Sequence, residues 1–211
     1  MSRDILKHNW KLPSDTVYIF GTGPNGKDHY GRVPANSWII GVNKAINLQE
    51  PISIWLCADG TLPKQEWFTK SAEYVISQKF ILDDHHRPTP CFDAGTLLKA
   101  YPNVPYYFIH GHTLRESPPF APEEGVLRSG GSISAQAIQL AYWLGAKRIV
   151  LVGVDMAGKT YFDDTTNLNP RLLPDGKSKH LRIMNGLCTW LRARGTEVVS
   201  LSPTALNVKV I

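Results

Sequence analysis

The chain has 211 residues, a formal net charge of +5 and a hydrophobic content of 43%, which fits one globular domain with a sizeable core. No apolar run approaches the roughly 18 residues of a membrane span, and residues 1–10 lack the apolar core of a secretory signal. Three widely spaced cysteines favour reduced thiols over a disulfide framework, so we expect a cytoplasmic protein. No long basic run or nucleic-acid motif is visible, and the mild positive charge is compatible with a small anionic ligand.

The first predicted strand, residues 17–20, runs directly into GTGPNG at 21–26, formally a GxGxxG motif. A dinucleotide site also needs a long helix after the glycines and an acidic residue about 20 positions further on. The glycines and proline that follow leave room for only one or two helical turns, and Asn43 stands at the acidic position. We therefore expect either a plain tight turn or a glycine turn that brings backbone N–H groups to a ligand phosphate or sugar.

Polar residues close the next two predicted strands, at 38–43 and 52–59. Asn43 ends the first of these strands and Asp59 the second. A single polar residue at a strand end is often only a turn former. Four predicted strand ends in this chain carry Gly, Asn or Asp, however: Gly21, Asn43, Asp59 and Asp155. Ligands of open α/β sheets bind outside the carboxyl ends of the strands, so the pattern predicts a shared polar crevice.

The middle of the chain predicts short helices at 63–71 and 93–101 and strands at 74–78 and 104–109. Two clusters there suggest metal ligands, DDHHRP at 83–88 and HGH at 110–112. Adjacent side chains diverge on any regular element, and no second cluster has ligand spacing. We therefore expect an exposed polar loop at the first cluster, rim packing at the second, and no metal site.

Residues 127–155 form the most informative stretch, LRSGGSISAQAIQLAYWLGAKRIVLVGVD. Apolar residues recur at helical spacing after Ser132, which predicts an amphipathic helix that Gly145 ends. The apolar run at 148–154 predicts a strand covered on both faces and closed by Asp155. A helix feeding a strand is half of a βαβ unit. The helix start (Gly130, Gly131, Ser132) and Asp155 should therefore share one rim.

Residues 156–179 are polar, aperiodic and broken by prolines, which is typical of a lid or binding loop. A second helix is predicted to open at Ser178-Lys-His180 and to run through Arg194-Gly195, followed by a last strand at 197–201 and a turn at 202–206. The whole pattern predicts a single α/β domain over residues 1–211. We expect a Rossmann-like, mostly parallel, doubly wound sheet with a lid over about 156–179.

This order of features resembles the bacterial sialyltransferases of the Campylobacter lipooligosaccharide type. It resembles the related domain of unknown function 115 even more closely, a group that includes motility-associated glycosylation factors and an archaeal 6-hydroxymethyl-dihydropterin diphosphokinase. The features are GxGP after strand one, Asn ending strand two, a Ser/Gly turn into a helix, GVD ending the next strand, a lid, a His opening a helix, and L-x-P near the carboxyl end. GGSISAQAIQLAYWLGAKRIVLVGVD is the most specific part.

The resemblance implies a role for each matching residue. Those expected to bind the nucleotide sugar are Gly21, Gly23, Pro24, Asn43, Asp59, Gly130, Gly131, Ser132 and Asp155. Asp59 departs from the sialyltransferases, which have Asn at this place, and is nearer the pattern of domain 115. His180 matches the general base, and Tyr161 matches one of two tyrosines that bond the departing phosphate. Ala157 stands about where the second tyrosine would be, and Lys159 on the lid is a further candidate for the phosphate. Histidine suits the role of base because it accepts a proton at neutral pH.

The leading hypothesis is therefore a metal-independent glycosyltransferase that uses a nucleotide sugar, with a glycan or small molecule as acceptor and no cofactor. A second hypothesis is a Mg-dependent ATP diphosphokinase, with Asp59, Asp155, Asp163 and Asp164 as candidate metal ligands. A third is a relative that binds nucleotide without turning it over. Nucleic acid and a membrane span are not expected, and homo-oligomer formation is compatible with the sequence.

Overall fold

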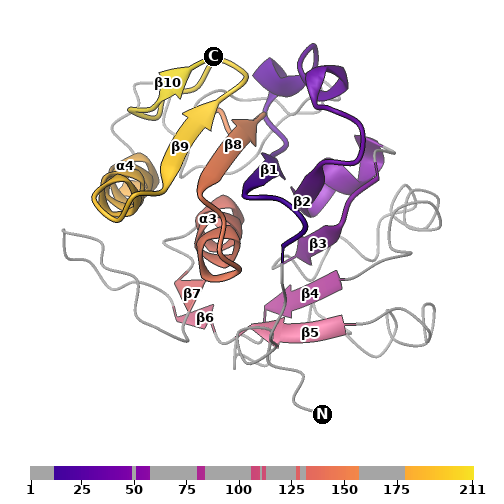
Figure 1. Ribbon diagram of the computed structural model, residues 1–211, viewed down its shortest axis with the longest axis horizontal. Coiled ribbons are helices and arrows are strands. Elements are labelled where there is room, and N and C mark those ends of the chain that lie inside the picture. The colour runs from indigo at the N-terminus through magenta and orange to yellow at the C-terminus, as the bar shows by residue number, and fades with distance from the viewer. Residues whose placement is uncertain are drawn as a thin grey trace.

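The fold of this protein is a parallel α/β sheet (Figure 1). The structure is a computed structural model that describes residues 12–48, 51–57, 80–83, 106–109, 111–112, 127–128, 132–156 and 179–211. The described strands are β1 (Thr16–Phe20), β2 (Trp38–Val42), β3 (Ile54–Cys57), β4 (Phe80–Asp83), β5 (Tyr106–Ile109), β6 (Gly111–His112), β7 (Leu127–Arg128), β8 (Arg148–Val152), β9 (Glu197–Ser200) and β10 (Lys209–Val210). The helices are η2 (Pro24–Gly26), η3 (Tyr30–Arg32), η4 (Asn43–Leu48), α3 (Ile133–Trp143) and α4 (Lys179–Arg192).

Eight strands form the main sheet in the order β10-β9-β8-β1-β2-β3-β4-β5, and every pair in it is parallel. The chain proceeds from β1 outward through β2 to β5, then returns to the other side of β1 and proceeds outward through β8, β9 and β10. The direction of strand order therefore reverses between β1 and β8. In open α/β sheets, such a topological switch point leaves a crevice outside the carboxyl ends of the two strands.

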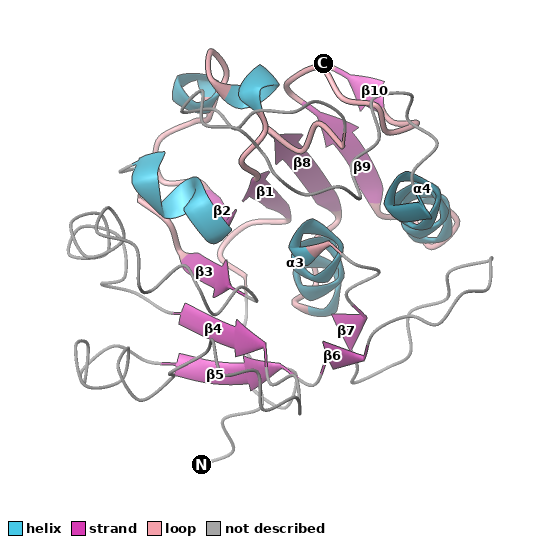
Figure 2. Cartoon of the chain, turned by 180° about the vertical axis from the view of Figure 1, so that it is seen from behind, coloured by secondary structure: helices cyan, strands magenta, loops and turns pink. Residues whose placement is uncertain are grey.

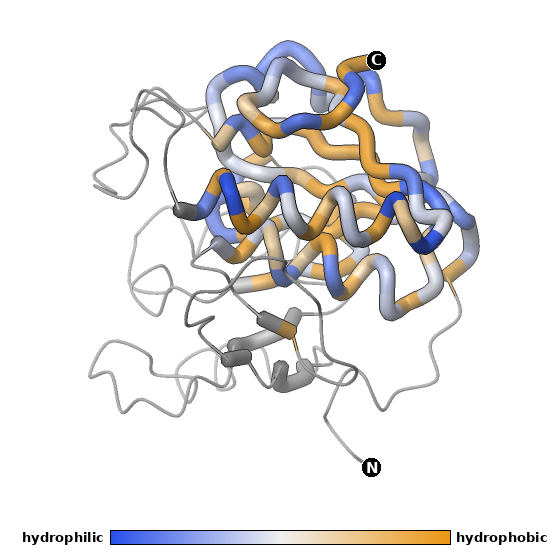
Figure 3. Tube along the Cα trace, turned by 90° about the vertical axis from the view of Figure 1, so that its left-hand side faces the viewer, coloured by the Kyte–Doolittle hydropathy of each residue, from blue (hydrophilic) through white to orange (hydrophobic). Residues whose placement is uncertain are grey.

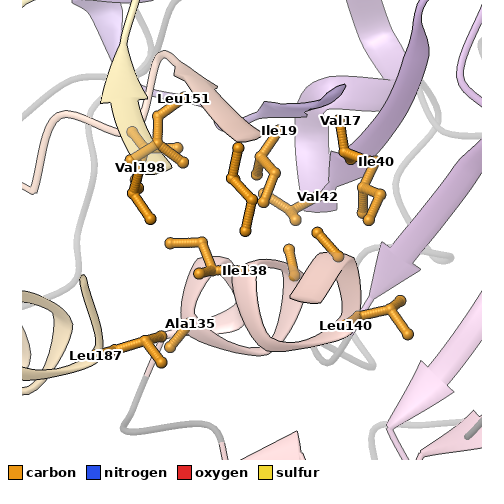
Figure 4. Close-up of a cluster of buried hydrophobic side chains, with 14 of the residues drawn as sticks. Val17, Ile19, Ile40, Val42, Ala135, Ile138, Leu140, Leu151, Leu187 and Val198 are labelled. Atoms are coloured by element: carbon orange, nitrogen blue, oxygen red, sulfur yellow. The ribbon is translucent and has the colours of Figure 1, made fainter. Parts of the chain in front are cut away.

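The helices α3 and α4 lie together on one face of the sheet, as the view from behind also shows (Figure 2). Alternate residues of the strands face these helices, which buries the cluster around Ile19, Ile40, Ile138 and Leu151 (Figure 4). In the view of Figure 3 the helices lie in front of the strands. The strands are mainly hydrophobic, whereas the helices carry both hydrophobic and hydrophilic residues. The buried β-branched residues explain why these segments form strands, and their burial supplies the main stabilisation of the sheet.

The helix α3 differs from its prediction in how much of it is buried. Its apolar positions face the core as expected, and Gly145 ends it with a φ of +98°. All eight residues from Ser134 to Ala141 are buried, however, including Gln136 and Gln139. The sheet covers one side of α3 while β7 and α4 pack on others, so the helix is enclosed rather than amphipathic. The helix α4 is amphipathic as predicted, with Met184, Leu187, Cys188 and Leu191 buried.

Most predicted strands are confirmed, and the sheet is parallel throughout rather than mostly. The polar cluster at 83–88 does not begin in a loop, because Asp83 is the last residue of strand β4. His112 belongs to the two-residue strand β6, which pairs with β7 in a second small sheet that the sequence pattern did not predict. The predicted elements at 63–71, 74–78 and 93–101 lie outside the described residues, as do residues 157–178 of the lid predicted at about 156–179.

Candidate functional site

The candidate site lies at the carboxyl edge of the sheet, around the switch point between β1 and β8. Residues 21–23 leave β1 and residues 153–155 leave β8 at this edge, and Asn43 follows the neighbouring strand β2. The helix α3 leads into the amino end of β8 and α4 into the amino end of β9, so both helices begin at the carboxyl edge. Ser132 and His180 therefore share this edge with the glycine turn, Asn43 and Asp155, as predicted.

The glycine turn packs tightly against the chain that leaves β8. The N–H of Gly21 donates to the Val152 carbonyl at 2.8 Å, and the N–H of Gly23 donates to the Gly153 carbonyl at 2.7 Å. A Cβ added at Gly21 would lie 2.3 Å from the Gly153 oxygen, and one added at Gly23 would lie 2.4 Å from Cγ of Asp155. The glycines are therefore required for close approach of two segments of the chain. Their two N–H groups bind the protein itself.

One amide of this turn differs from its neighbours. Within the described residues the N–H of Thr22 has no hydrogen-bond acceptor, whereas those of Gly21 and Gly23 both donate toward the β8 side. Successive N–H groups of an extended chain alternate in direction. The Thr22 N–H therefore points away from β8, toward the side of β1 on which β2 and Asn43 lie. Pro24 has no N–H and fixes the start of η2.

Asp155 is the most unusual charged group of the site. It is 4% exposed, and its Oδ2 accepts the Asn25 N–H at 2.8 Å. Its Oδ1 is buried and has no hydrogen-bond partner among the described residues. Burial raises the pKa of the Asp155 carboxyl from 3.8 to about 6, and the hydrogen bond from Asn25 partly opposes this. The carboxylate is therefore mostly ionised at pH 7 although it is poorly solvated there.

Asn43 shows the same pattern at the end of β2. Its backbone adopts a left-handed conformation with a φ of +46°, which asparagine tolerates better than most residues. The Asn43 carbonyl accepts the indole N–H of Trp55 at 2.8 Å, so the residue is held in place. Its side-chain Oδ1 is buried and unpartnered within the described residues. Buried polar atoms are almost always hydrogen-bonded, so a ligand donor is a natural partner for this oxygen.

The two helix starts contribute differently. Ser132 caps α3, because its Oγ accepts the Ser134 N–H at 3.3 Å. This explains locally why the helix begins there, and the hydroxyl keeps its own hydrogen to donate. His180 is the second residue of α4 and is half-buried. The positive end of each helix dipole lies at this edge and favours a nearby anion.

Three residues near Asp155 were missed by sequence reasoning. The buried Tyr30 donates its hydroxyl to the Gly21 carbonyl at 3.0 Å. Ser202 accepts the Gly153 N–H at 2.9 Å, and Thr204 donates to the Val154 carbonyl at 2.7 Å. The loop after β9 therefore holds the chain that leaves β8 from one side while Tyr30 holds the glycine turn. The only sequence signal was the L-x-P motif at 201–203.

Several predicted site residues lie outside the described residues, namely Asp59, Gly130, Gly131, Lys159 and Tyr161. The same holds for Asp163 and Asp164, the further metal candidates of the diphosphokinase hypothesis. Among the described residues no group of three or more histidine, cysteine or acidic side chains is placed to hold a metal ion. None of the described helices is both long enough and apolar enough to cross a membrane.

Comparison with known proteins yields structural neighbours only, since no protein-family model and no curated protein sequence matches the chain. The sialyltransferase CstII of Campylobacter jejuni, solved with the substrate analogue CMP-3FNeuAc, superposes with a TM-score of 0.55 at 15% identity, over 92% of this chain and 85% of that chain. The fold is that of these sialyltransferases.

Two further neighbours agree. The α-2,3-sialyltransferase Cst-I of Campylobacter jejuni gives a TM-score of 0.53 at 16% identity, over 92% of this chain and 79% of that chain. The MAf glycosyltransferase of Magnetospirillum magneticum gives a TM-score of 0.58 at 15% identity, over 100% of this chain and 37% of that chain. The sialyltransferase-type, Rossmann-like fold predicted from the sequence is thus confirmed. The resemblance to domain 115 stays a prediction, because no family model matches.

Proposed function

We propose that this protein is a glycosyltransferase that uses a nucleotide-activated sugar, with a CMP-linked sugar as the first donor to test. The observation that supports this most is a pair of buried oxygens at the carboxyl edge, Oδ1 of Asn43 and Oδ1 of Asp155, which have no hydrogen-bond partner in the described part of the chain. Both oxygens can accept a hydrogen bond, and the N–H of Thr22, on the chain that leaves β1, can donate one. A ligand that supplies hydroxyl or amino donors together with an acceptor satisfies all three, and a nucleotide sugar carries these groups.

The choice of CMP rests on the structural neighbours. CstII has been solved with CMP-3FNeuAc and, separately, with a trisaccharide acceptor and CMP. We extend both ligand classes to this chain as part of the proposal, with a glycan or small molecule as acceptor.

In the proposed reaction an acceptor hydroxyl attacks the anomeric carbon of the sugar, and the bond from that carbon to the phosphate oxygen breaks. His180 at the start of α4 takes the hydroxyl proton. The starts of α3 and α4 favour the phosphate that departs. Tyr161 and Lys159 keep their predicted role as partners of this phosphate.

Ligand binding tests the first part of the proposal. Thermal unfolding is measured with CMP, CDP, UDP, GDP and ATP, each with Mg²⁺ and with EDTA. A ligand at 100 times its Kd stabilises the protein by about 2.7 kcal/mol, which a melting curve detects readily. We expect stabilisation by CMP in EDTA. Stabilisation by ATP that requires Mg²⁺ would instead favour the diphosphokinase hypothesis and contradict the proposal.

Catalysis tests the second part. Replacement of His180 by Ala should lower sugar transfer from a CMP-linked donor by about 100-fold or more, the usual effect of removing a general base. CMP binding should persist in this variant. His29→Ala is the matched control, because His29 pairs with Arg32 at 2.8 Å on the segment between η2 and η3. Equal turnover in His180→Ala and the wild type would remove His180 from the mechanism.

A further inference from the structure

A buried tyrosine lies under the glycine turn and contacts both halves of the switch point. Tyr30 belongs to η3, is 5% exposed and packs its ring on Phe20 with the centroids 5.1 Å apart. Its hydroxyl donates to the Gly21 carbonyl at 3.0 Å. A Cβ added at Gly153 would lie 2.3 Å from this hydroxyl oxygen, and one added at Gly26 would lie 2.6 Å from it. The hydroxyl therefore fills a space that two glycines, Gly26 and Gly153, leave free.

The hydroxyl of Tyr30 remains protonated and able to donate. Burial, together with the nearby charge of Asp155, raises the pKa of the Tyr30 phenol above its ordinary value of 10.0. The hydrogen bond to Gly21 is thus present throughout the neutral pH range. Because the whole group is enclosed, the orientation of the Gly21 carbonyl is fixed by this donor.

The Gly21 carbonyl and the Thr22 N–H belong to the same peptide unit. In a planar trans peptide the C=O and the N–H point in opposite directions. A donor that holds the carbonyl on the β8 side therefore aims the N–H at the opposite side, where Asn43 follows β2. The flanking N–H groups of Gly21 and Gly23 donate to carbonyls of the β8 side. Thr22 therefore carries the one N–H of residues 21–23 that has no acceptor among the described residues.

We propose that Tyr30 is a positioning residue, whose hydroxyl holds the Gly21–Thr22 peptide so that the Thr22 N–H donates to a phosphate oxygen of the bound nucleotide. This inference rests on the proposed function, because it assumes that a nucleotide occupies the crevice. It adds a residue from η3 whose hydroxyl is bonded to the glycine turn. It also assigns the glycine turn a single ligand-binding amide.

The test is isothermal titration of the wild type, Tyr30→Phe and Tyr18→Phe with CMP and with cytidine. Tyr30→Phe keeps the ring and removes only the donor. Tyr18→Phe is the matched control, since Tyr18 is on the same strand as Phe20 but faces a hollow lined by Ser37 and Arg148. We expect Tyr30→Phe to raise the Kd for CMP about tenfold, the effect of one lost or misaligned hydrogen bond to an anion. The Kd for cytidine should change by less than about threefold.

A purely structural role predicts a different result. Loss of stability lowers the melting temperature. In a protein that is still folded at the assay temperature, however, it does not change the ratio of the Kd for CMP to the Kd for cytidine. A second readout is the amide resonance of Thr22 in ¹⁵N-labelled protein. CMP should shift this proton strongly downfield in the wild type and in Tyr18→Phe, and markedly less in Tyr30→Phe.

The outcomes separate the inference from the proposed function. Equal CMP affinity in the wild type and Tyr30→Phe would overturn the role of Tyr30 and leave the nucleotide site standing. Equal losses for CMP and cytidine would also overturn it, because the effect would not concern the phosphate. No binding of CMP to the wild type would overturn both.

Discussion

Asp155 allows a quantitative test of the site without any ligand. Burial disfavours its ionised form, so the folded protein holds a proton up to about pH 6 that the unfolded chain releases near pH 3.8. Below pH 3.8 the carboxyl is protonated in both states, so its titration does not lower the free energy of unfolding. Between these values the unfolded state binds fewer protons than the folded state, so the free energy of unfolding falls as the pH rises. Above pH 6 the carboxyl is ionised in both states, so the loss in free energy of unfolding caused by its burial is constant.

The size of the effect follows from the two pKa values. Each pKa unit corresponds to 1.36 kcal/mol, so the change from 3.8 to about 6 amounts to about 3 kcal/mol. Asp155→Asn removes the titration while an amide oxygen still accepts the Asn25 N–H. The unfolded carboxyl is already more than half ionised at pH 4. We therefore expect the free energy of unfolding of Asp155→Asn, minus that of the wild type, to increase by about 2 kcal/mol between pH 4 and pH 7.

Urea denaturation of both proteins at half-unit steps of pH measures this difference. Other titrating groups occur in both proteins and cancel in the subtraction. The absolute offset between the variants is not part of the prediction, because the new amide N–H₂ adds an unmatched donor. A difference that is independent of pH, or that decreases as the pH rises, would refute the burial and pKa assigned to Asp155.

Three further predictions concern the site and the core. Gly23→Ala should destabilise the protein by about 1–3 kcal/mol, the usual cost of overpacking, because its Cβ would lie 2.4 Å from Cγ of Asp155. Gly31→Ala, where a Cβ meets nothing within 4 Å, should change stability by less than about 0.5 kcal/mol; equal effects in urea denaturation would contradict this packing. If a nucleotide donor binds Oδ1 of Asp155, CMP affinity measured by calorimetry should increase from pH 5 to pH 7, and a constant affinity would argue against that contact. Burial raises the pKa of Cys188 to about 12, so mass spectrometry should find its peptide unmodified by iodoacetamide at pH 8 unless urea is present.

The strands and their shared edge could be predicted because the relevant signals are local. Runs such as RIVLV at 148–152 are apolar without alternation, which requires burial on both faces, and the polar residues that follow then lie at one edge. The helix stop at Gly145 is equally local, since it needs one left-handed residue. Local patterns of this kind suffice to predict that Asn43 and Asp155 lie at the carboxyl edge.

The contacts that make the site unusual could not be predicted, because they join segments distant in the chain. Residue 25 donates to residue 155, and residue 202 accepts from residue 153. The sequence also suggested that the glycine turn offers its N–H groups to a ligand, whereas Gly21 and Gly23 bind the β8 side. Tyr30 carries no motif that marks it, and its role follows only from the glycines packed around its hydroxyl.

The burial of α3 shows a second limit of sequence patterns. Gln136 and Gln139 predict a polar face toward solvent, yet both are fully buried. The side-chain N–H₂ of Gln139 donates to the Ala135 carbonyl at 2.8 Å, one turn earlier. A glutamine side chain that is hydrogen-bonded to its own helix can be buried at a low free-energy cost. The spacing of apolar residues along a helix does not predict such burial.

The central claim is that a nucleotide binds at the switch point, through buried polar atoms that have no partner among the residues that the structure describes. Calorimetry of CMP with Asn43→Gly tests it most directly. Glycine adopts the left-handed backbone of Asn43 without strain and removes only the side-chain amide. Asn36→Gly is the matched control, because Asn36 is also left-handed, with a φ of +65°, but lies in the exposed loop before β2. We predict about tenfold weaker CMP binding in Asn43→Gly and unchanged binding in Asn36→Gly. Equal affinity in all three proteins would contradict the claim.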